Sequence, residues 1–204
     1  MVEIRDWRIW YDSLVIDPMY GEPVSKPTVT QLDQFEQETG FRLPRSYREY
    51  IEVFGPGRLF ADWDIAAPGY GPSWFFDLHG MQANMVPEER WIRRYPEEHR
   101  DRVLRCRYFC SKYKDAFGWD PAEVCDPEAH EYAVYRIVED KRVIRVADSF
   151  RGFVEDAALD RLTYPGWDEE ELGPRLLFEP AARQAEPLYG PSDLNKNDES
   201  SHLA

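Results

Sequence analysis

Two short helices joined by a tight turn are the feature that most constrains the fold of this chain. The first helix is predicted to begin at Thr30, whose hydroxyl can cap free backbone amides, with Asp33 at the third helical position. Gly40 is its expected end, because glycine adopts the left-handed conformation after a last turn at little cost. Pro44 suits the first turn of the next helix, where a missing N–H is not needed. The predicted buried positions of this pair are Leu32, Phe35, Tyr47, Tyr50, Ile51 and Phe54, and Gly55 ends the second helix.

The segments around this helix pair predict an α+β domain. In chain order, the expected elements are a helix over residues 3–15, a loop over 60–71, a strand over 74–78, a short helix from Pro87, strands over 104–110 and 116–120, a hairpin of 132–138 with 142–147, and a last helix that begins at Asp148 or Ser149. Helices, then strands, then a helix is typical of an α+β domain and not of a doubly wound sheet.

The chain is strongly acidic, which limits its partners. The formal net charge of its 204 residues is −14 at pH 7. We expect one domain over residues 1–185 and a polar, mobile tail over residues 186–204. The tail holds four acidic residues and one lysine, so most of the negative charge belongs to the folded part. An acidic surface repels phosphate backbones and attracts basic proteins, so we expect a basic protein partner and no nucleic acid.

The sequence also predicts where the chain functions. Residues 1–7 carry charges where a signal peptide needs an unbroken apolar stretch. No apolar run in the sequence approaches the roughly 20 residues of a membrane helix. Cys106, Cys110 and Cys125 are few and odd in number, which favours reduced thiols. We therefore expect a cytoplasmic protein that binds no membrane.

The sequence contains no set of residues with the spacing of a known catalytic or metal site. Its histidines (His79, His99, His130 and His202) form no metal-binding pattern. Cys106 and Cys110 on one strand would stand about 13 Å apart, too far to share a metal or a disulfide. A hydrolase elbow and a phosphate loop are absent from the sequence. We therefore predict no catalytic residue, no metal and no cofactor.

Residues 32–50 resemble the signature of the SUKH superfamily, which comprises Smi/Knr-like cell-wall-synthesis regulators and bacterial toxin-immunity proteins. The signature has an acidic residue late in one helix, a glycine, a Leu-Pro pair, a tyrosine and an apolar residue a turn later. In this chain these residues are Glu36, Gly40, Leu43, Pro44, Tyr47 and Ile51. The family often has Asn-Gly after the second helix, whereas this chain has Phe54-Gly55. The resemblance continues with less specificity over about residues 5–162, and the part after Leu162 has no counterpart.

This resemblance implies a single SUKH-like α+β domain, with helices packed around a mixed, largely antiparallel sheet. The signature itself is a helix–turn–helix joint, so its residues mark the fold and no active chemistry. The resemblance further implies a protein-binding module, above all an immunity protein that neutralises a cognate nuclease-type toxin. A constitutive regulatory or scaffold protein of the cell-wall-regulator type is the alternative, and an enzyme is the least favoured function.

A partner-binding loop is the one site hypothesis that the residues themselves suggest. Asp62, Trp63 and Asp64, with Tyr70 nearby, combine an aromatic anchor with flanking carboxylates. Such a group suits a basic target, because the ring is desolvated on binding while the acids pair with lysine or arginine. The alternative is that Trp63 folds into the core, since tryptophan is largely buried in most proteins.

Overall fold

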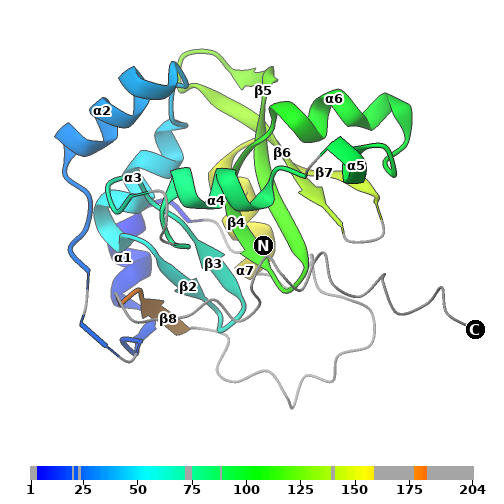
Figure 1. The fold of residues 1–204 in the computed structure, drawn as a ribbon. Coiled ribbons are helices and arrows are strands. Elements are labelled where there is room, and N and C mark those ends of the chain that lie inside the picture. Colours follow the sequence, from blue (N-terminus) through cyan, green and yellow to red (C-terminus); the bar gives the residue numbers. More distant parts are fainter. Residues whose placement is uncertain are drawn as a thin grey trace, which may run out of the picture.

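A computed structural model describes residues 4–19, 21–22, 24–71, 75–87, 89–138, 141–158 and 177–182 (Figure 1). Its helices are α1 (Trp7–Asp12), α2 (Val29–Thr39), α3 (Arg45–Phe54), α4 (Leu78–Met85), α5 (Glu89–Ile92), α6 (Glu97–Arg105) and α7 (Phe150–Ala158). Its strands are β1 (Val15–Ile16), β2 (Gly57–Leu59), β3 (Trp63–Ile65), β4 (Arg107–Lys112), β5 (Asp115–Asp126), β6 (Glu131–Ile137), β7 (Val143–Ala147) and β8 (Leu177–Pro180).

The strands of the described residues form one mixed sheet in the order β1-β8-β2-β3-β4-β5-β6-β7. From β2 to β7 each strand pairs antiparallel with the next along the chain. At the other edge, β8 pairs antiparallel with β2 and parallel with β1. This arrangement confirms the predicted α+β fold with a mixed, largely antiparallel sheet.

Helices cover both faces of the sheet, as two adjacent residues of β4 show. The hydroxyl of Tyr108 donates to the carbonyl of Val103 in α6, at 2.8 Å. The ring of Phe109 instead lies 5.4 Å from Phe150 and 5.2 Å from Phe153, both in α7. Since neighbouring side chains of a strand point to opposite faces, α6 and α7 lie on opposite sides of the sheet (Figure 1).

Several predicted elements are confirmed. Gly40 ends α2 with φ of 65°, in the left-handed region where glycine is favoured. The hairpin is present as β6 and β7, and the last helix as α7. The first helix is present but shorter than expected, because Asp6 caps it and its turns end at Asp12.

The predicted start of α2 was wrong by two residues. Thr28, and not Thr30, is the N-cap, since its hydroxyl accepts from the Gln31 N–H while the Gln31 side chain accepts from the Thr28 N–H. This reciprocal pair is a capping box, and it satisfies two amide groups at once. Asp33 instead binds Arg48 of α3, at 2.8 Å.

One predicted strand begins later than expected, and another predicted strand and a predicted loop were wrong. The strand expected over 104–110 is present as β4 from Arg107. Residues 104–106 are not strand, because α6 extends to Arg105 with glutamates in its first turn and arginines in its last, as the helix dipole favours. In the segment predicted as a strand over 74–78, Asp77 caps the first amides of α4 through His79 and Gly80. The predicted loop over 60–71 contains β3, which pairs with β2 and β4.

The expected tail over residues 186–204 lies outside the described residues, and so does Leu162. The structure therefore leaves the predicted domain boundary at residue 185 as a prediction. Within the described part of the chain, no helix has both the length and the apolar character needed to span a membrane.

Candidate functional site

The signature residues form the joint between α2 and α3. Glu36 is 7% exposed and accepts from the backbone N–H of Leu43 at 2.9 Å. Its carboxylate also accepts from Arg42 at 2.8 Å and from Arg48 at 3.0 Å. Burial alone would raise the pKa of Glu36, but these three hydrogen bonds lower it overall. The buried carboxylate therefore stays ionised and holds the turn.

The other signature side chains fill the core beneath this joint. Tyr47 is fully buried, and its hydroxyl donates to the carbonyl of Ala66 at 2.6 Å. Its ring meets Trp119 and Phe150 edge-on, with centroids 4.9 and 5.1 Å apart. Leu43 and Ile51 are 1% and 0% exposed. These side chains are part of the core beneath the joint.

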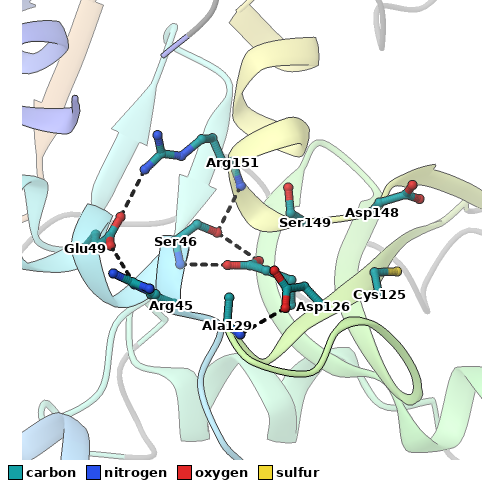
Figure 2. A pocket seen from close by; sticks show the side chains of 10 residues that line it. Arg45, Ser46, Glu49, Cys125, Asp126, Ala129, Asp148, Ser149 and Arg151 are labelled. Atoms are coloured by element: carbon teal, nitrogen blue, oxygen red, sulfur yellow. Dashed lines mark hydrogen bonds and ion pairs between the residues drawn. The ribbon is translucent and has the colours of Figure 1, made fainter. Parts of the chain in front are cut away.

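An open pocket lies directly beside this joint (Figure 2). It has a volume of about 500 Å³ and lies where the first turn of α3, the turn between β5 and β6, and the first turn of α7 meet. Its lining is almost entirely polar or charged: Arg45, Ser46, Glu49, Cys125, Asp126, Ala129, Glu131, Asp148, Ser149 and Arg151. We refer to it below as the α3–α7 pocket.

The floor of the pocket is a buried carboxylate held by two helix N-termini. Glu131 of β6 is 7% exposed and accepts from the Ser46 N–H at 2.8 Å and the Ser46 hydroxyl at 2.9 Å. It also accepts from the Phe150 N–H at 3.3 Å. Ser46 and Phe150 lie in the first turns of α3 and α7, where free amides and the helix dipole both favour an anion. Glu131 therefore joins the sheet to two helices.

The rim of the pocket carries a second layer of charges. Glu49 accepts from Arg45 at 3.2 Å and from Arg151 at 3.0 Å (Figure 2). Asp126 accepts from backbone amides of its own turn, and its side chain is exposed. The Asp148 side chain is 77% exposed and pairs with Arg145 at 2.7 Å. Asp126 and Asp148 are thus the most exposed carboxylates of the rim.

Two nucleophilic groups of the pocket, Ser46 and Cys125, are each constrained by their neighbours. The Ser46 hydroxyl donates to Glu131 and accepts from the Arg151 N–H at 3.2 Å, so both sides of the oxygen are occupied. Burial and the neighbouring carboxylates Asp148 and Glu123 raise the pKa of Cys125, against the opposing effect of Arg145. A thiol with a raised pKa is a weak nucleophile at neutral pH. The geometry suits the binding of charged groups better than covalent chemistry.

Comparison with protein families identifies the fold. The model of the SMI1 / KNR4 family (SUKH-1) matches residues 26–156, more than half of the chain. The chain belongs to the SUKH family. The match runs from the residues before α2 into α7. It therefore includes all of α3 and the first part of α7, the two helices that meet at the α3–α7 pocket. The elements α1, β1 and β8 lie outside the match. Neither a curated protein nor a solved structure matches the chain.

In this SUKH domain, two of the four residues predicted to bind a partner, Trp63 and Asp64, are buried, and the other two are partly exposed. Trp63 is 3% exposed and packs on Phe117 and Phe153, with centroids 5.0 and 5.3 Å away. It thus occupies the core, the alternative that the sequence left open. Asp62 is partly exposed and is held by Lys112 at 3.4 Å and by the Tyr113 hydroxyl at 3.0 Å.

Tyr70 is held in a different place. Its N–H donates to Asp77 at 2.8 Å and its hydroxyl donates to the carbonyl of Ser25. Burial, with a smaller effect of Asp77, raises its pKa to about 12. Its side chain remains partly exposed. Different parts of the fold therefore hold Tyr70 and Asp62.

Asp64 forms a buried ion pair with Arg58, at 2.7 Å. Burial raises the pKa of Asp64 to about 6, although Arg58 opposes the shift, and Glu179 and Asp62 add to it. The folded chain thus binds this proton more tightly than the unfolded chain, whose aspartate pKa is about 3.9. The corresponding stability is fully present below about pH 4 and is lost as the pH rises through about 6.

We therefore expect the Asp64→Asn variant to lose this pH dependence. Between pH 7 and pH 4 the wild type should gain about 3 kcal/mol of unfolding free energy relative to the variant, since two pKa units correspond to about that energy. Urea unfolding at several pH values measures the difference. Asp12→Asn, an exposed position on α1, is the matched control. If the difference in unfolding free energy between wild type and Asp64→Asn does not change with pH, the pKa of Asp64 is not raised in the folded chain.

The pocket residues carry little local signal in the sequence. Glu131 meets Ser46 across 85 positions of the chain, so no spacing rule brings them together. Ser149 was a candidate cap, and it does accept from the Gly152 N–H at 3.0 Å. In the described residues, no group of three or more His, Cys, Asp or Glu side chains could hold a metal ion.

Proposed function

We propose that this SUKH protein is an immunity protein that binds a basic, nuclease-type toxin domain and blocks its substrate cleft. The observation that carries this proposal is the family match over residues 26–156, since the SUKH family includes immunity proteins as well as Smi1/Knr4-type regulators. The net charge of −14 supports it, because a nuclease that binds phosphate backbones presents a basic surface. Such a protein would act in the cytoplasm, where the nucleic acid is.

The α3–α7 pocket is the part of the surface best suited to this partner. Asp126 and Asp148 present carboxylates at its rim. The buried Glu131 binds backbone N–H groups of α3 and α7, and Glu49 pairs with the side chains of Arg45 and Arg151. A rigid rim binds a lysine or arginine of the partner with little loss of conformational freedom. We also expect Asp62 and Tyr70 to affect binding directly, because their side chains are partly exposed, whereas changes at Trp63 would act through the core.

The test begins with the full-length protein as bait for its own cell lysate and for the products of neighbouring genes. Recovery of a basic nuclease-like protein in a one-to-one complex, with loss of its nuclease activity, supports the proposal. The family description also includes regulators, so recovery of cell-wall or housekeeping proteins alone would favour a regulatory scaffold instead. Substrate turnover by the purified chain would favour an enzyme.

With the complex in hand, we expect the double variant Asp126→Asn/Asp148→Asn to weaken binding by about tenfold at low salt. The reason is the loss of two carboxylates that face the partner, while asparagine keeps the local hydrogen bonds. Titration calorimetry from 50 to 500 mM NaCl measures the affinities. The wild-type affinity should fall as salt rises, because salt screens exposed charges.

The matched control is Glu97→Gln/Glu98→Gln, which removes the same charge from exposed positions of α6. This control should bind within about twofold of the wild type. Equal effects of the two double variants would show that only the net charge matters and that the pocket is not the binding site.

A further inference from the structure

A second hollow lies between α2 and α4. It consists of two adjoining pockets that share Phe35 and His79. These two rings lie 5.0 Å apart, so they form the boundary between the pockets. One pocket has a volume of about 120 Å³ and the other of about 490 Å³. We refer to the pair as the α2–α4 groove.

The smaller pocket is apolar and its walls are rigid. Its main walls are Phe35, Phe41, Leu78, Tyr108 and Trp119, each no more than 9% exposed. Phe41 stacks on Trp119 at 5.8 Å, and Trp119 stacks on Phe109 at 4.2 Å. Gln82, also in the lining, ties α4 to β4 by donating to the Cys106 carbonyl and accepting from the Tyr108 N–H. The pocket is therefore preformed.

The size of the smaller pocket limits its occupant. A cavity of about 150 Å³ is known to hold benzene, so a pocket of about 120 Å³ suits an aliphatic side chain such as leucine, valine or methionine. The indole of a tryptophan would be too large. Burial of one such side chain supplies a useful part of the affinity of a peptide.

The charges at the two ends of the groove differ in sign. Arg107 borders the apolar pocket, and its side chain is exposed. Glu38 borders the larger pocket, with 52% of its side chain exposed. Gln34 donates to Glu38 at 2.6 Å and His79 lies 3.9 Å from it, so the carboxylate is held in place. An occupant that spans both pockets meets an arginine at one end and a glutamate at the other.

We propose that the α2–α4 groove binds an extended segment of the partner protein, whose aliphatic side chain enters the apolar pocket and whose basic residue pairs with Glu38. An acidic residue on the far side of the aliphatic side chain pairs with Arg107. The identification of this partner as the toxin rests on the proposed function; the chemistry of the segment rests on the groove alone.

The first test uses synthetic probes and does not require the toxin. The probes are the blocked hexapeptide Gly-Asp-Leu-Gly-Lys-Gly and its reversed sequence, titrated into the isotopically labelled full-length protein and followed by NMR. At least one should shift signals of Phe35, Leu78, His79 and Trp119. Replacement of the leucine or the lysine of that peptide by alanine should weaken binding, by at least about tenfold for the leucine. No binding of either peptide would overturn the proposal.

Two protein variants locate the binding. Glu38→Lys should weaken the peptide by about fivefold or more, while Glu52→Lys, an exposed site on α3 with the same change in charge, should not. His79→Trp should fill the groove and abolish binding; a thermal melt confirms that it folds. Equal peptide affinity in wild type, Glu38→Lys and His79→Trp would place the peptide elsewhere and sink the idea. If His79→Trp self-associates more weakly than the wild type in analytical ultracentrifugation, the groove binds a second copy of this chain instead of a partner protein.

The same variants separate this proposal from the proposed function. If Glu38→Lys weakens the peptide but no toxin is ever captured, the groove is correct and the immunity role is wrong. If a toxin is captured and Glu38→Lys binds it as the wild type does, the immunity role stands and the groove is not its binding site.

Discussion

Replacement of Glu131 by alanine is expected to lower the free energy of unfolding by about 3–5 kcal/mol. The carboxylate is 7% exposed and accepts three hydrogen bonds from Ser46 and Phe150. Alanine leaves these donors without an acceptor in a site too buried for water to replace it fully. It also removes the negative charge that the N-termini of α3 and α7 stabilise.

Urea unfolding of the variant at neutral pH measures this loss. Glu131→Gln should lose about 1–3 kcal/mol, because the amide keeps one acceptor oxygen but no charge. Glu128→Ala, an exposed position in the turn that precedes Glu131, should remain within about 0.5 kcal/mol of the wild type. Equal losses in the three variants would mean that Glu131 contributes no more to stability than the exposed Glu128. The helices α3 and α7 would then be held against the sheet by packing alone.

The elements that the sequence predicted best are those whose causes are local. Gly40 ends α2, and apolar side chains repeat through α3 at helical spacing, so neighbours within one turn suffice for the prediction. The β6–β7 hairpin is also local, because a few residues separate its strands. The family signature lies in this same local part of the chain.

The wrong predictions concern segments whose structure depends on contacts with residues distant in the sequence. The alternation of apolar residues from Leu104 to Cys110 suggested a strand, but Leu104 is 46% exposed and belongs to α6. The mixture of acidic and aromatic residues around Trp63 predicts a loop, whereas Trp63 lies in β3 and its ring packs on Phe117 and Phe153, which are distant in the sequence. The pairing of β1 with β8 joins residues 15–16 to 177–178, which no local pattern indicates.

The candidate site shows the same division. The α2–α3 joint could be predicted from sequence, and the two hollows beside it could not. Phe41 borders the α2–α4 groove, and Arg45 and Ser46 border the α3–α7 pocket. The remaining walls come from α4, α7 and the sheet, whose positions depend on the whole fold. The local motif thus supplies one edge of each hollow, and tertiary packing supplies the rest.

A second large loss is expected when Asp120 is replaced. Asp120 is 0% exposed and accepts from Arg105 through two N–H groups, at 2.6 and 2.7 Å, and from Arg102 at 2.9 Å. Burial would raise the pKa of Asp120, but these hydrogen bonds and one from the Ala122 N–H lower it overall. Asp64, which is also buried but has a single arginine contact, has its pKa raised to about 6. The greater number of donors at Asp120 thus favours a lowered pKa, whereas Glu179 and Asp62 help to raise the pKa of Asp64.

We expect Asp120→Asn to lower the unfolding free energy at pH 7 by about 3–5 kcal/mol. The change removes the anion that binds Arg105 and leaves Arg102 with the more distant carboxylate of Glu123, at 3.7 Å. A lowered folded pKa gives stability that is present above the unfolded value of about 3.9 and is lost as the pH falls through the folded value. The difference from wild type should thus be constant from pH 8 to 5 and shrink below about pH 4. Urea unfolding across this range, with exposed Asp101→Asn on the same helix as the arginines as control, measures it. A difference that instead grows between pH 7 and 5 would give Asp120 a raised pKa, like that of Asp64, and would mean that burial outweighs its three arginine hydrogen bonds.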